Sequence, residues 1–325
     1  MRDRSDLRDT ILFGDCRETL PMFNVKARMC VTSPPYYGLR DYGGEDSQIG
    51  QEKSPEEFID ELVKVFREVR NVLTDDGTCW VNLGDSYYNY RPGSKAYVKQ
   101  TVSKTNQDLP ESSPKRGTKL DGLKEKDLIG IPWMLAFALR ADGWYLRQDI
   151  IWHKPNPMPE SVRDRCTKSH EYIFLLSKNR KYFYDNEAIK EPAKDWGTRD
   201  RTNGKYHNEG TGLQPHSGLT KSYEKRNKRS VWTVTKKPYK GAHFATYPPD
   251  LIEPCILAGS EVGDIVLDPF MGSGTTAAVA KSLGRDYIGC ELHEDYGNLI
   301  EKRVGEYAPV MEVTHSPLLD AINQV

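Results

Sequence analysis

Short apolar runs alternate along this chain with stretches of helical pattern, and this alternation predicts an α/β protein. The runs are short enough to be buried strands, and most of them end in polar or turn-forming residues. They lie at 11–15, 27–31, 78–83, 148–153, 172–176, 264–268 and 286–291. Helices are predicted near Ser54, Ile131 and Ala277. A chain of 325 residues is long enough for one large α/β domain or two smaller ones.

The stretch after Ser54 carries the clearest helical pattern. Ser54 is suited to cap the first turn, and Pro55 to occupy its first position. Two acids follow at 56 and 57, where the positive end of the helix dipole favours them. Apolar side chains then recur at helical spacing, at positions 58, 62, 65, 66, 69 and 73. The pattern predicts one face packed on a sheet and a helix that ends at Asp76–Gly77.

Two long polar segments, 86–130 and 187–240, interrupt the alternation. Between residues 91 and 126 nine basic residues stand against four acidic ones, and between 190 and 240 thirteen stand against five. The second segment also contains interleaved aromatic residues, which are Trp196, Tyr206, His207, Tyr223 and Trp232. Cations that bind phosphates, together with flat rings that stack on bases, predict a nucleic-acid surface. The alternative is that both segments are solvated loops.

The overall composition gives a small net charge and limits the classes of protein to which the chain can belong. The formal net charge is −1, so any nucleic acid has to be held by local basic patches. No apolar run is long enough to span a bilayer, and the first residues lack the apolar core of a signal peptide. The six cysteines include no C-x-x-C pair. We therefore expect a reduced, cytoplasmic protein with no membrane contact and no metal site.

The strongest chemical signal is a glycine-containing turn near the end of the chain. A predicted strand ends in Asp268, and the turn Pro269–Thr276 opens a helix. The next strand ends in Glu291, 23 residues after Asp268. This distance is close to the ~20-residue offset at which an acid meets a ribose hydroxyl in nucleotide-binding folds.

The residues of this turn discriminate between nucleotide-like ligands. A phosphate-binding P-loop would carry lysine after its second glycine, where Thr275 stands. A dinucleotide fold has no acid facing the pyrophosphate, whereas Asp268 directly precedes this turn. An acid at that place suits an ammonium group instead. We therefore predict S-adenosylmethionine (AdoMet), with Asp268 on its ammonium and Glu291 on its ribose.

A second candidate site follows the strand at 27–31. Ser33 and two prolines end this strand in a rigid, extended exit, and Tyr36 and Tyr37 come next. Open α/β sheets bind ligands at the carboxyl ends of their strands. A hydroxyl, free carbonyls and an aromatic ring on one rigid turn suit an exocyclic amino group on a flat heterocycle. Taken alone, the stretch also fits an ordinary proline-rich loop.

Together these motifs resemble those of the amino DNA methyltransferases, which methylate exocyclic nitrogens of cytosine or adenine. Ser33–Tyr36 is similar to their catalytic tetrapeptide, Asp268–Thr276 to their AdoMet loop, and Ile288–Glu291 to their ribose-binding strand. His243–Pro248 resembles the segment under the methionine end of the cofactor, and Gly14–Asp15 the strand end that meets the adenine amino group. This order is that of the beta class. It implies a Rossmann-like, AdoMet-dependent methyltransferase fold with circularly permuted motif order and inserted target-recognition segments.

The resemblance also implies roles for individual residues. The implied catalytic residues are Ser33, Pro34, Pro35 and Tyr36. The implied cofactor-binding residues are Asp15, Phe244, Thr246, Asp268, Pro269, Phe270, Gly272, Gly274, Thr275, Thr276 and Glu291. For DNA binding we predict the basic cluster Lys225, Arg226, Lys228 and Arg229. In this scheme Ser33 Oγ and the Pro34 carbonyl accept hydrogens of the reacting amine, and Tyr36 stacks on the flipped base.

Serine in the first tetrapeptide position is usual for the N4-cytosine enzymes of this family. We therefore predict a site-specific methyltransferase that acts on cytosine N4 in double-stranded DNA. The alternative within the family is adenine N6. Outside it, the alternatives are an RNA or protein methyltransferase and a DNA-binding module that has lost catalysis, although Ser33, Asp268 and Glu291 are all present.

The same motifs divide the chain into predicted parts. These are a catalytic half (1–85), a polar basic insert (86–130), a continuation of the sheet (131–186), a target-recognition region (187–240) and an AdoMet-binding half (241–325). A cognate restriction endonuclease and a homodimer are left open as further partners. A prokaryotic or phage source is expected.

Overall fold

The structure, a computed structural model, describes residues 7–38, 48–88, 120, 122–193, 224–235 and 247–306. The strands of its central sheet are β1 (Thr10–Phe13), β2 (Ala27–Thr32), β3 (Leu73–Leu83), β4 (Tyr145–His153), β5 (His170–Ser177), β8 (Val231–Thr233), β9 (Ile265–Asp268) and β10 (Asp286–Glu291). A separate two-stranded sheet pairs β6 (Glu191–Pro192) with β7 (Lys225–Arg226). The helices are α1 (Cys16–Thr19), α2 (Pro55–Val72), α3 (Ile131–Ala141), α4 (Pro249–Gly259), α5 (Thr275–Ser282) and α6 (Gly297–Glu306), with 3-10 turns at Leu20–Met22 and Glu294–Tyr296.

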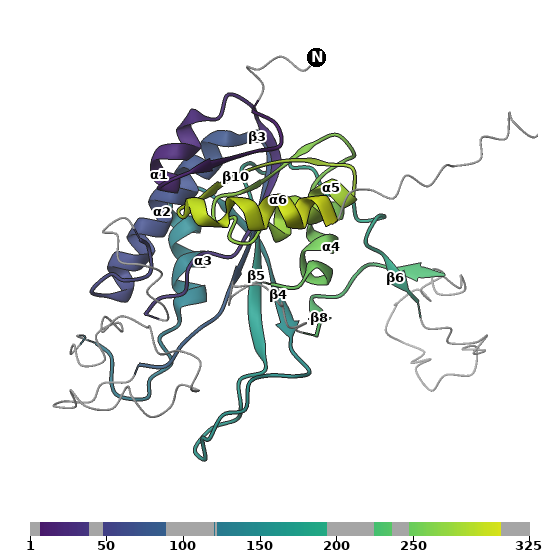
Figure 1. Cartoon of the computed structure of the whole chain (residues 1–325). Coiled ribbons are helices and arrows are strands. Elements are labelled where there is room, and N and C mark those ends of the chain that lie inside the picture. The colour runs from purple at the N-terminus through teal and green to yellow at the C-terminus, as the bar shows by residue number, and fades with distance from the viewer. Residues whose placement is uncertain are drawn as a thin grey trace, which may run out of the picture.

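The central sheet is mixed, and its strand order is β1-β10-β9-β2-β3-β5-β4-β8. The first five strands in this order run parallel to one another. Strand β5 is antiparallel to both β3 and β4, and β8 is parallel to β4. Figure 1 shows α1, α2 and α3 together on one side of the sheet and α4 and α5 on the other, while α6 runs across the front of the view and contacts α5. All seven strands predicted from the apolar runs are present.

Both faces of the sheet are covered by helices, and successive strand residues alternate between the two faces. In β2, Cys30 packs in the core under α2 and α3, while Met29 and Val31 pack in the core under α4. In β9, Leu267 packs in the core under α2 and α3, and Val266 packs in the core under α4. Because neither face is exposed to water, each residue of these strands can be apolar. This explains why the strands appear in the sequence as continuous apolar runs.

The helix predicted after Ser54 is α2, and its cap is confirmed: Ser54 Oγ accepts a hydrogen bond from the Glu57 N–H at 3.2 Å. The predicted end at Asp76–Gly77 is wrong, because the chain becomes extended at Leu73 and starts β3 there. The pairing of β3 with β2 shifts register after Leu73, so the turn residues mark an irregularity within the strand. The pattern also missed α4, which contains Pro254, and α6.

Part of the segment 187–240 belongs to the main sheet. Strand β8 pairs with the last residues of β4, from Ile151↔Val231 to His153↔Thr233. The Trp232 side chain is only 6% exposed, and its indole N–H donates to the Arg229 carbonyl at 2.7 Å. The prediction that Trp232 belongs to a DNA-facing surface is therefore wrong. Its large apolar ring fills the core beside Trp152 instead.

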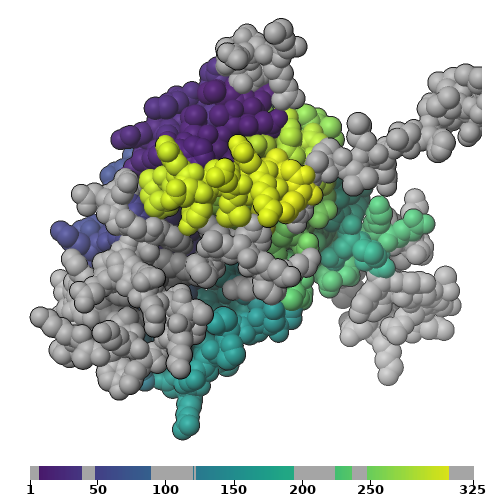
Figure 2. All heavy atoms as spheres, viewed as in Figure 1, coloured from purple at the N-terminus to yellow at the C-terminus, as the bar shows by residue number. Residues whose placement is uncertain are grey.

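Segments from the two ends of the described chain meet at one edge of the sheet. Strand β1 pairs with β10, and the Phe13 ring lies so close to Gly297 that a Cβ there would come within 3.3 Å of it. Figure 2 shows α6, in yellow, directly beside the purple N-terminal segment. Among the residues that the structure describes, no helix is long and apolar enough to cross a membrane.

We expect Trp232→Ala to lower the free energy of unfolding by about 3–5 kcal/mol, because it removes a buried aromatic ring from the core. Val231→Ala is the matched control: Val231 lies on the same strand but is 59% exposed, so its truncation should cost less than about 0.5 kcal/mol. Urea denaturation of both variants measures the difference. Equal effects would mean that β8 is not an integral part of the core.

Candidate active site

The described residues of the predicted catalytic and cofactor sites gather at one edge of the sheet. Since β1, β10, β9, β2 and β3 are parallel, their carboxyl ends lie at the same edge. Gly14 N–H, after β1, donates to the Glu291 carbonyl of β10 at 2.8 Å. Thr32 Oγ1, at the end of β2, donates to Asp268 Oδ1 of β9 at 2.6 Å. The predicted cofactor and catalytic motifs therefore adjoin, although more than 200 residues separate them in the sequence.

Asp268 has its carboxylate buried and surrounded by donors. The side chain is 1% exposed. Oδ1 accepts from Thr32 Oγ1 and, at 3.0 Å, from the Phe270 N–H. Oδ2 accepts from Thr276 Oγ1 at 2.5 Å and from the Tyr247 hydroxyl at 3.0 Å. Burial raises the pKa of this carboxyl, and the hydroxyl donors oppose the shift. Among the described residues these partners are all neutral, and a buried anion so placed is suited to an ammonium group, which would add a positive charge.

The turn after Asp268 is shaped by glycines. Gly272 and Gly274 have φ values of 54° and 80°, a left-handed conformation that glycine adopts without strain. The Gly272 N–H donates to Glu291 Oε2 at 2.7 Å, so the turn is fixed to the end of β10. At Gly289 a Cβ would lie 2.7 Å from the Asp268 carbonyl oxygen. Only glycine at that position lets β10 approach the turn so closely.

Glu291 is the second buried acid of the site. Its side chain accepts backbone hydrogen bonds from Gly272 and, at 3.1 Å, from His293. Burial nevertheless raises the pKa of this carboxyl to about 7, and the charge of Asp268 adds to the shift. A carboxylate held at a strand end, with acceptor capacity left over, fits the hydroxyl groups of a ribose. Near neutral pH the charge of this group is therefore sensitive to whatever binds beside it.

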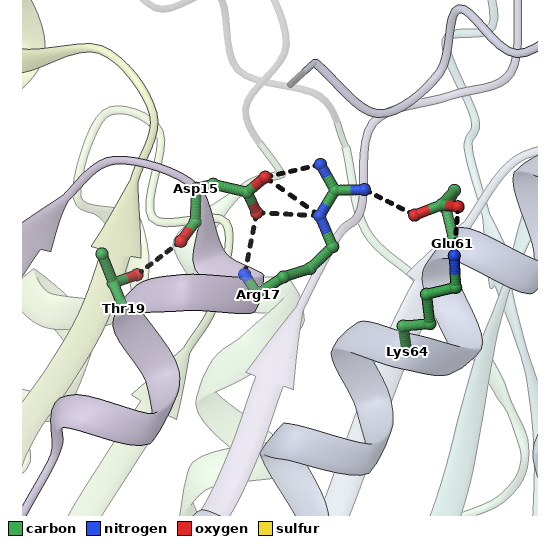
Figure 3. Close-up of polar contacts among 5 residues, drawn as sticks. All are labelled: Asp15, Arg17, Thr19, Glu61 and Lys64. Carbon is green, nitrogen blue, oxygen red and sulfur yellow. Dashed lines mark hydrogen bonds and ion pairs between the residues drawn. The ribbon is translucent and has the colours of Figure 1, made fainter. Parts of the chain in front are cut away.

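Asp15 is held by its own neighbour, as Figure 3 shows. Its Oδ1 caps α1 by accepting from the Arg17 N–H at 2.8 Å, and both carboxylate oxygens accept from the Arg17 guanidinium. Arg17 in turn donates to Glu61 Oε2 of α2 at 2.5 Å, and Lys64 binds the other oxygen of Glu61. An adenine amino group would have to share the Asp15 carboxylate with Arg17. The predicted contact of Asp15 with adenine stays a prediction.

The catalytic tetrapeptide follows β2 directly. Ser33 is half-buried and Pro34 is buried. The Tyr36 hydroxyl donates to Glu171 Oε2 at 2.8 Å, so the ring is anchored at its far end. After the tetrapeptide, Gly38 N–H donates to the Gly50 carbonyl at 2.9 Å. The tetrapeptide is thus held at Tyr36, and the chain just after it at Gly38.

The remaining predicted residues are two cofactor residues, Phe244 and Thr246, and the basic cluster. Phe244 and Thr246 lie outside the described residues, but the adjoining Tyr247 is in contact with Asp268 and Thr276. In the basic cluster, Arg226 and Arg229 both bind Glu191, with Nε–Oε1 distances of 2.9 and 2.7 Å. The other two members are Lys225, which is exposed, and Lys228, whose ammonium lies 5.1 Å from the Trp232 ring centre.

Sequence reasoning missed three residues of the site, namely Thr32, Tyr247 and Glu171. Thr32 and Tyr247 lie within or next to stretches that the motifs singled out, but their hydroxyls meet Asp268 only in the folded structure. Glu171 gave no such signal. It lies at the start of β5, 135 residues from Tyr36, and only the antiparallel pairing of β5 with β3 brings it to the site.

Comparison with known proteins identifies the family. Residues 27–302 match the N6/N4 DNA methylase family. The chain belongs to this family. It is 47% identical to the type II methyltransferase M.SmaI of Serratia marcescens, over 92% of each chain. It is 45% identical to M.Cfr9I of Citrobacter freundii, over 94% of this chain and 90% of the relative. This methylase is thus a type II, AdoMet-dependent DNA methyltransferase related to enzymes of bacterial restriction–modification systems.

Solved structures share its α/β fold with a mixed central sheet. The PvuII DNA methyltransferase, which is cytosine-N4-specific, superposes with a TM-score of 0.57 at 17% identity, covering 90% of this chain and 85% of the other. A candidate DNA modification methylase of Thermus thermophilus, solved with S-adenosyl-L-methionine, gives a TM-score of 0.56 at 24% identity, covering 92% and 93%. At these identities the likeness concerns the fold of the methylase.

We expect Glu291→Gln to stabilise the ligand-free methylase at pH 8 and to weaken AdoMet binding. The folded protein holds the Glu291 proton more tightly than the unfolded chain does, so protonated Glu291 contributes to wild-type stability. This contribution is fully present below about pH 4.5 and is lost as the pH rises to about 7. Glutamine removes this loss, which is on the order of 3 kcal/mol for the full shift.

Ribose hydroxyls donate to the ionised carboxylate, so AdoMet affinity in the wild type should fall as the pH drops below about 7. Urea denaturation and calorimetric AdoMet titration at pH 5.5 and 8 measure both effects. Glu253→Gln, at an exposed position of α4, is the matched control. A glutamine variant with wild-type pH dependence of binding would contradict the role of Glu291.

Proposed function

We propose that this methylase transfers a methyl group from AdoMet to the exocyclic N4 of a flipped cytosine at a specific site in double-stranded DNA. The observation that carries the proposal is the position of Ser33. It stands first in the catalytic tetrapeptide, as is usual for N4-cytosine enzymes of the family, and follows Thr32, which binds Asp268. The acceptor amine and the cofactor would therefore meet at the edge of the sheet where β2 and β9 end.

The chemistry required of the protein is the preparation of a weak nucleophile. The lone pair of an exocyclic amine is delocalised into the ring, so acceptors on the N4 hydrogens have to localise it. Ser33 Oγ and the Pro34 carbonyl, which directly follow the end of β2, would act as those acceptors. Bound AdoMet supplies an electrophilic methyl group. Positioning and preorganised polarity account for most of the rate enhancement.

Each predicted cofactor residue would bind a different part of AdoMet. Asp268 would bind the ammonium, Glu291 the ribose and Asp15 the adenine end. Residues of the turn, Pro269, Phe270, Gly272, Gly274, Thr275 and Thr276, would surround the methionine portion together with Phe244 and Thr246. The burial of Asp268 among Thr32, Tyr247 and Thr276 supports this arrangement. In this scheme the fold is a Rossmann-like domain with permuted motif order, built from the halves 1–85 and 241–325 with the sheet continuation 131–186.

Double-stranded DNA would be bound by the segments 86–130 and 187–240. Their excess of basic residues supports this role. Within the second segment, the salt bridges of Arg226 and Arg229 to Glu191 order the cluster before any DNA binds. The type II relatives suggest a cognate restriction endonuclease that reads the same site, and a prokaryotic cytoplasm as the setting.

Mass spectrometry of nucleosides tests the proposal directly. DNA is incubated with the enzyme and AdoMet, then digested, and N4-methylcytosine is the expected product. N6-methyladenine would replace the base assignment, and no methylated nucleoside would refute the activity. Sequencing of the methylated DNA then defines the target site.

We expect Ser33→Ala to lower the single-turnover rate by about ten- to a thousandfold, since it removes one preorganised polar partner of the reacting amine. AdoMet and DNA affinity should stay near wild type, because Ser33 binds the amine most strongly as charge develops on it. Rapid-quench methylation of the mapped site and equilibrium binding measure the two properties. A wild-type rate would assign the whole role to the Pro34 carbonyl.

Replacing Lys225, Arg226, Lys228 and Arg229 by alanine should weaken DNA binding and flatten its salt dependence. Each lost phosphate contact should reduce the log–log slope by ~0.9. Fluorescence anisotropy across a series of salt concentrations gives the slope. Lys302→Ala, at an exposed position of α6, is the control. If the slope of the fourfold variant equals that of the control, the basic cluster does not contact DNA.

A further inference from the structure

A buried charged network lies behind the catalytic tetrapeptide. The Tyr36 hydroxyl donates to Glu171 Oε2 at 2.8 Å, and Lys154 forms an ion pair with Oε1 of the same carboxylate. The Lys154 and Glu171 side chains are only 8% and 13% exposed. Asn82 Nδ2 adds a weaker contact to Oε2 at 3.4 Å. Asn82 of β3 and Lys154, just after β4, thus converge on the carboxylate of Glu171 in β5, which accepts from Tyr36.

The sheet topology explains how these residues meet. Strands β3 and β4 run in the same direction with β5 antiparallel between them, so the start of β5 lies at the edge where the other two end. Glu171 is the second residue of β5, and Lys154 directly follows β4. The Lys154 N–H donates to the Ser169 carbonyl at 2.7 Å, and its ammonium lies 4.3 Å from the centre of the Trp152 ring. Both charged groups are therefore held by backbone and aromatic neighbours.

The Tyr36 ring is confined along its edge as well as at its hydroxyl. A Cβ at Gly84 would lie 2.8 Å from Cε2 of Tyr36 and 3.3 Å from the Glu171 side chain. The absence of a side chain at the end of β3 therefore makes room for the ring. Burial raises the pKa of the Tyr36 hydroxyl well above its usual range, and the Glu171 charge acts in the same direction. The hydroxyl keeps its hydrogen and donates it to the carboxylate.

We propose that Glu171 and Lys154 are positioning residues, which fix the Tyr36 ring in the orientation that receives the flipped target base. The inference rests on the proposed function and adds residues from β4 and β5 to the acceptor site. Lys154 forms an ion pair with Glu171, and Glu171 accepts the hydrogen bond of the Tyr36 hydroxyl. Only the ring of Tyr36 is then offered to the base, by stacking. The Glu171 carboxylate already accepts hydrogen bonds from Tyr36, Lys154 and Asn82. It therefore acts through Tyr36 and does not itself remove a proton from the amine.

One experiment tests the network without any reference to activity. Tyrosine labelled with carbon-13 at its ζ position reports on each phenol by NMR, and Tyr36→Phe identifies the Tyr36 signal by its absence. Glu171→Gln should shift this signal, because glutamine is a weaker acceptor than a carboxylate. Asp142→Asn is the matched control, since Asp142 forms a salt bridge to Arg67 and its side chain is 15% exposed. An unchanged Tyr36 signal in a folded Glu171→Gln variant would refute the network whether or not the enzyme methylates DNA.

A double-mutant cycle then tests its purpose. With Tyr36 present, Glu171→Gln should slow single-turnover methylation by about tenfold, the loss expected for one hydrogen bond to a charged group. In the Tyr36→Phe background, which keeps the stacking ring but lacks the hydroxyl, the same substitution should change the rate less than about twofold. AdoMet affinity should stay constant throughout. Thermal unfolding verifies that each variant is folded. Glu171→Gln alone leaves the buried Lys154 without its ion-pair partner, so the paired variant Lys154→Met/Glu171→Gln serves as a second variant without that charge.

The outcomes separate the possible roles. Equal losses in both backgrounds would show that Glu171 acts on the substrate directly and would overturn the proposal. A Glu171→Gln enzyme with the wild-type rate would overturn it too. If the wild-type enzyme forms no methylated nucleoside, the proposed function fails, while the NMR measurement still decides whether the network exists.

Discussion

The structure of the site depends on the burial of one carboxylate, that of Asp268, at the junction of the two functional halves. A carboxylate taken out of water is costly unless donors replace the water. Here the hydroxyl donors come from three separate places in the chain: Thr32 from β2, Thr276 from α5 and Tyr247 from just before α4. Satisfying Asp268 therefore requires that these segments assemble correctly. The same contacts connect the cofactor loop to the residue before Ser33.

Asp268, Glu291 and Glu171 lie at this edge of the sheet with largely covered side chains, and each has a different environment. Asp268 is satisfied by hydroxyls, Glu291 by backbone N–H groups and Glu171 by a lysine and a tyrosine. Only Glu171 has a formal positive partner among the contacts described above. The other two carry pKa values raised by burial, so without a ligand they reduce stability near neutral pH. In the proposed arrangement, AdoMet would place an ammonium at Asp268 and ribose hydroxyls at Glu291, and so would offset that cost.

The network at Tyr36 gives the acceptor side the same kind of preorganisation. Charged groups in a low-dielectric place hold their partners more firmly than they would in water. The position of the ring is fixed by Glu171 at one end and by the bare backbone of Gly84 along one edge. The polar contacts around Asp268 and Tyr36 form within the protein itself, and under the proposed function they would preorganise the cofactor side and the base side of the site.

The sequence by itself determined the local elements and the family motifs of this protein. Continuous apolar runs predicted the strands because both faces of the sheet are covered, and the Ser54 cap predicted the start of α2 because capping is a local interaction. The acids at the ends of β9 and β10 identified the cofactor because their spacing lies within one β-turn-α-β unit. Tertiary structure alone decided the rest. Trp232 joins the core, and Glu171 reaches Tyr36, through strand pairings between segments distant in sequence. A pattern read along the chain cannot show such contacts, because they depend on which strands become neighbours.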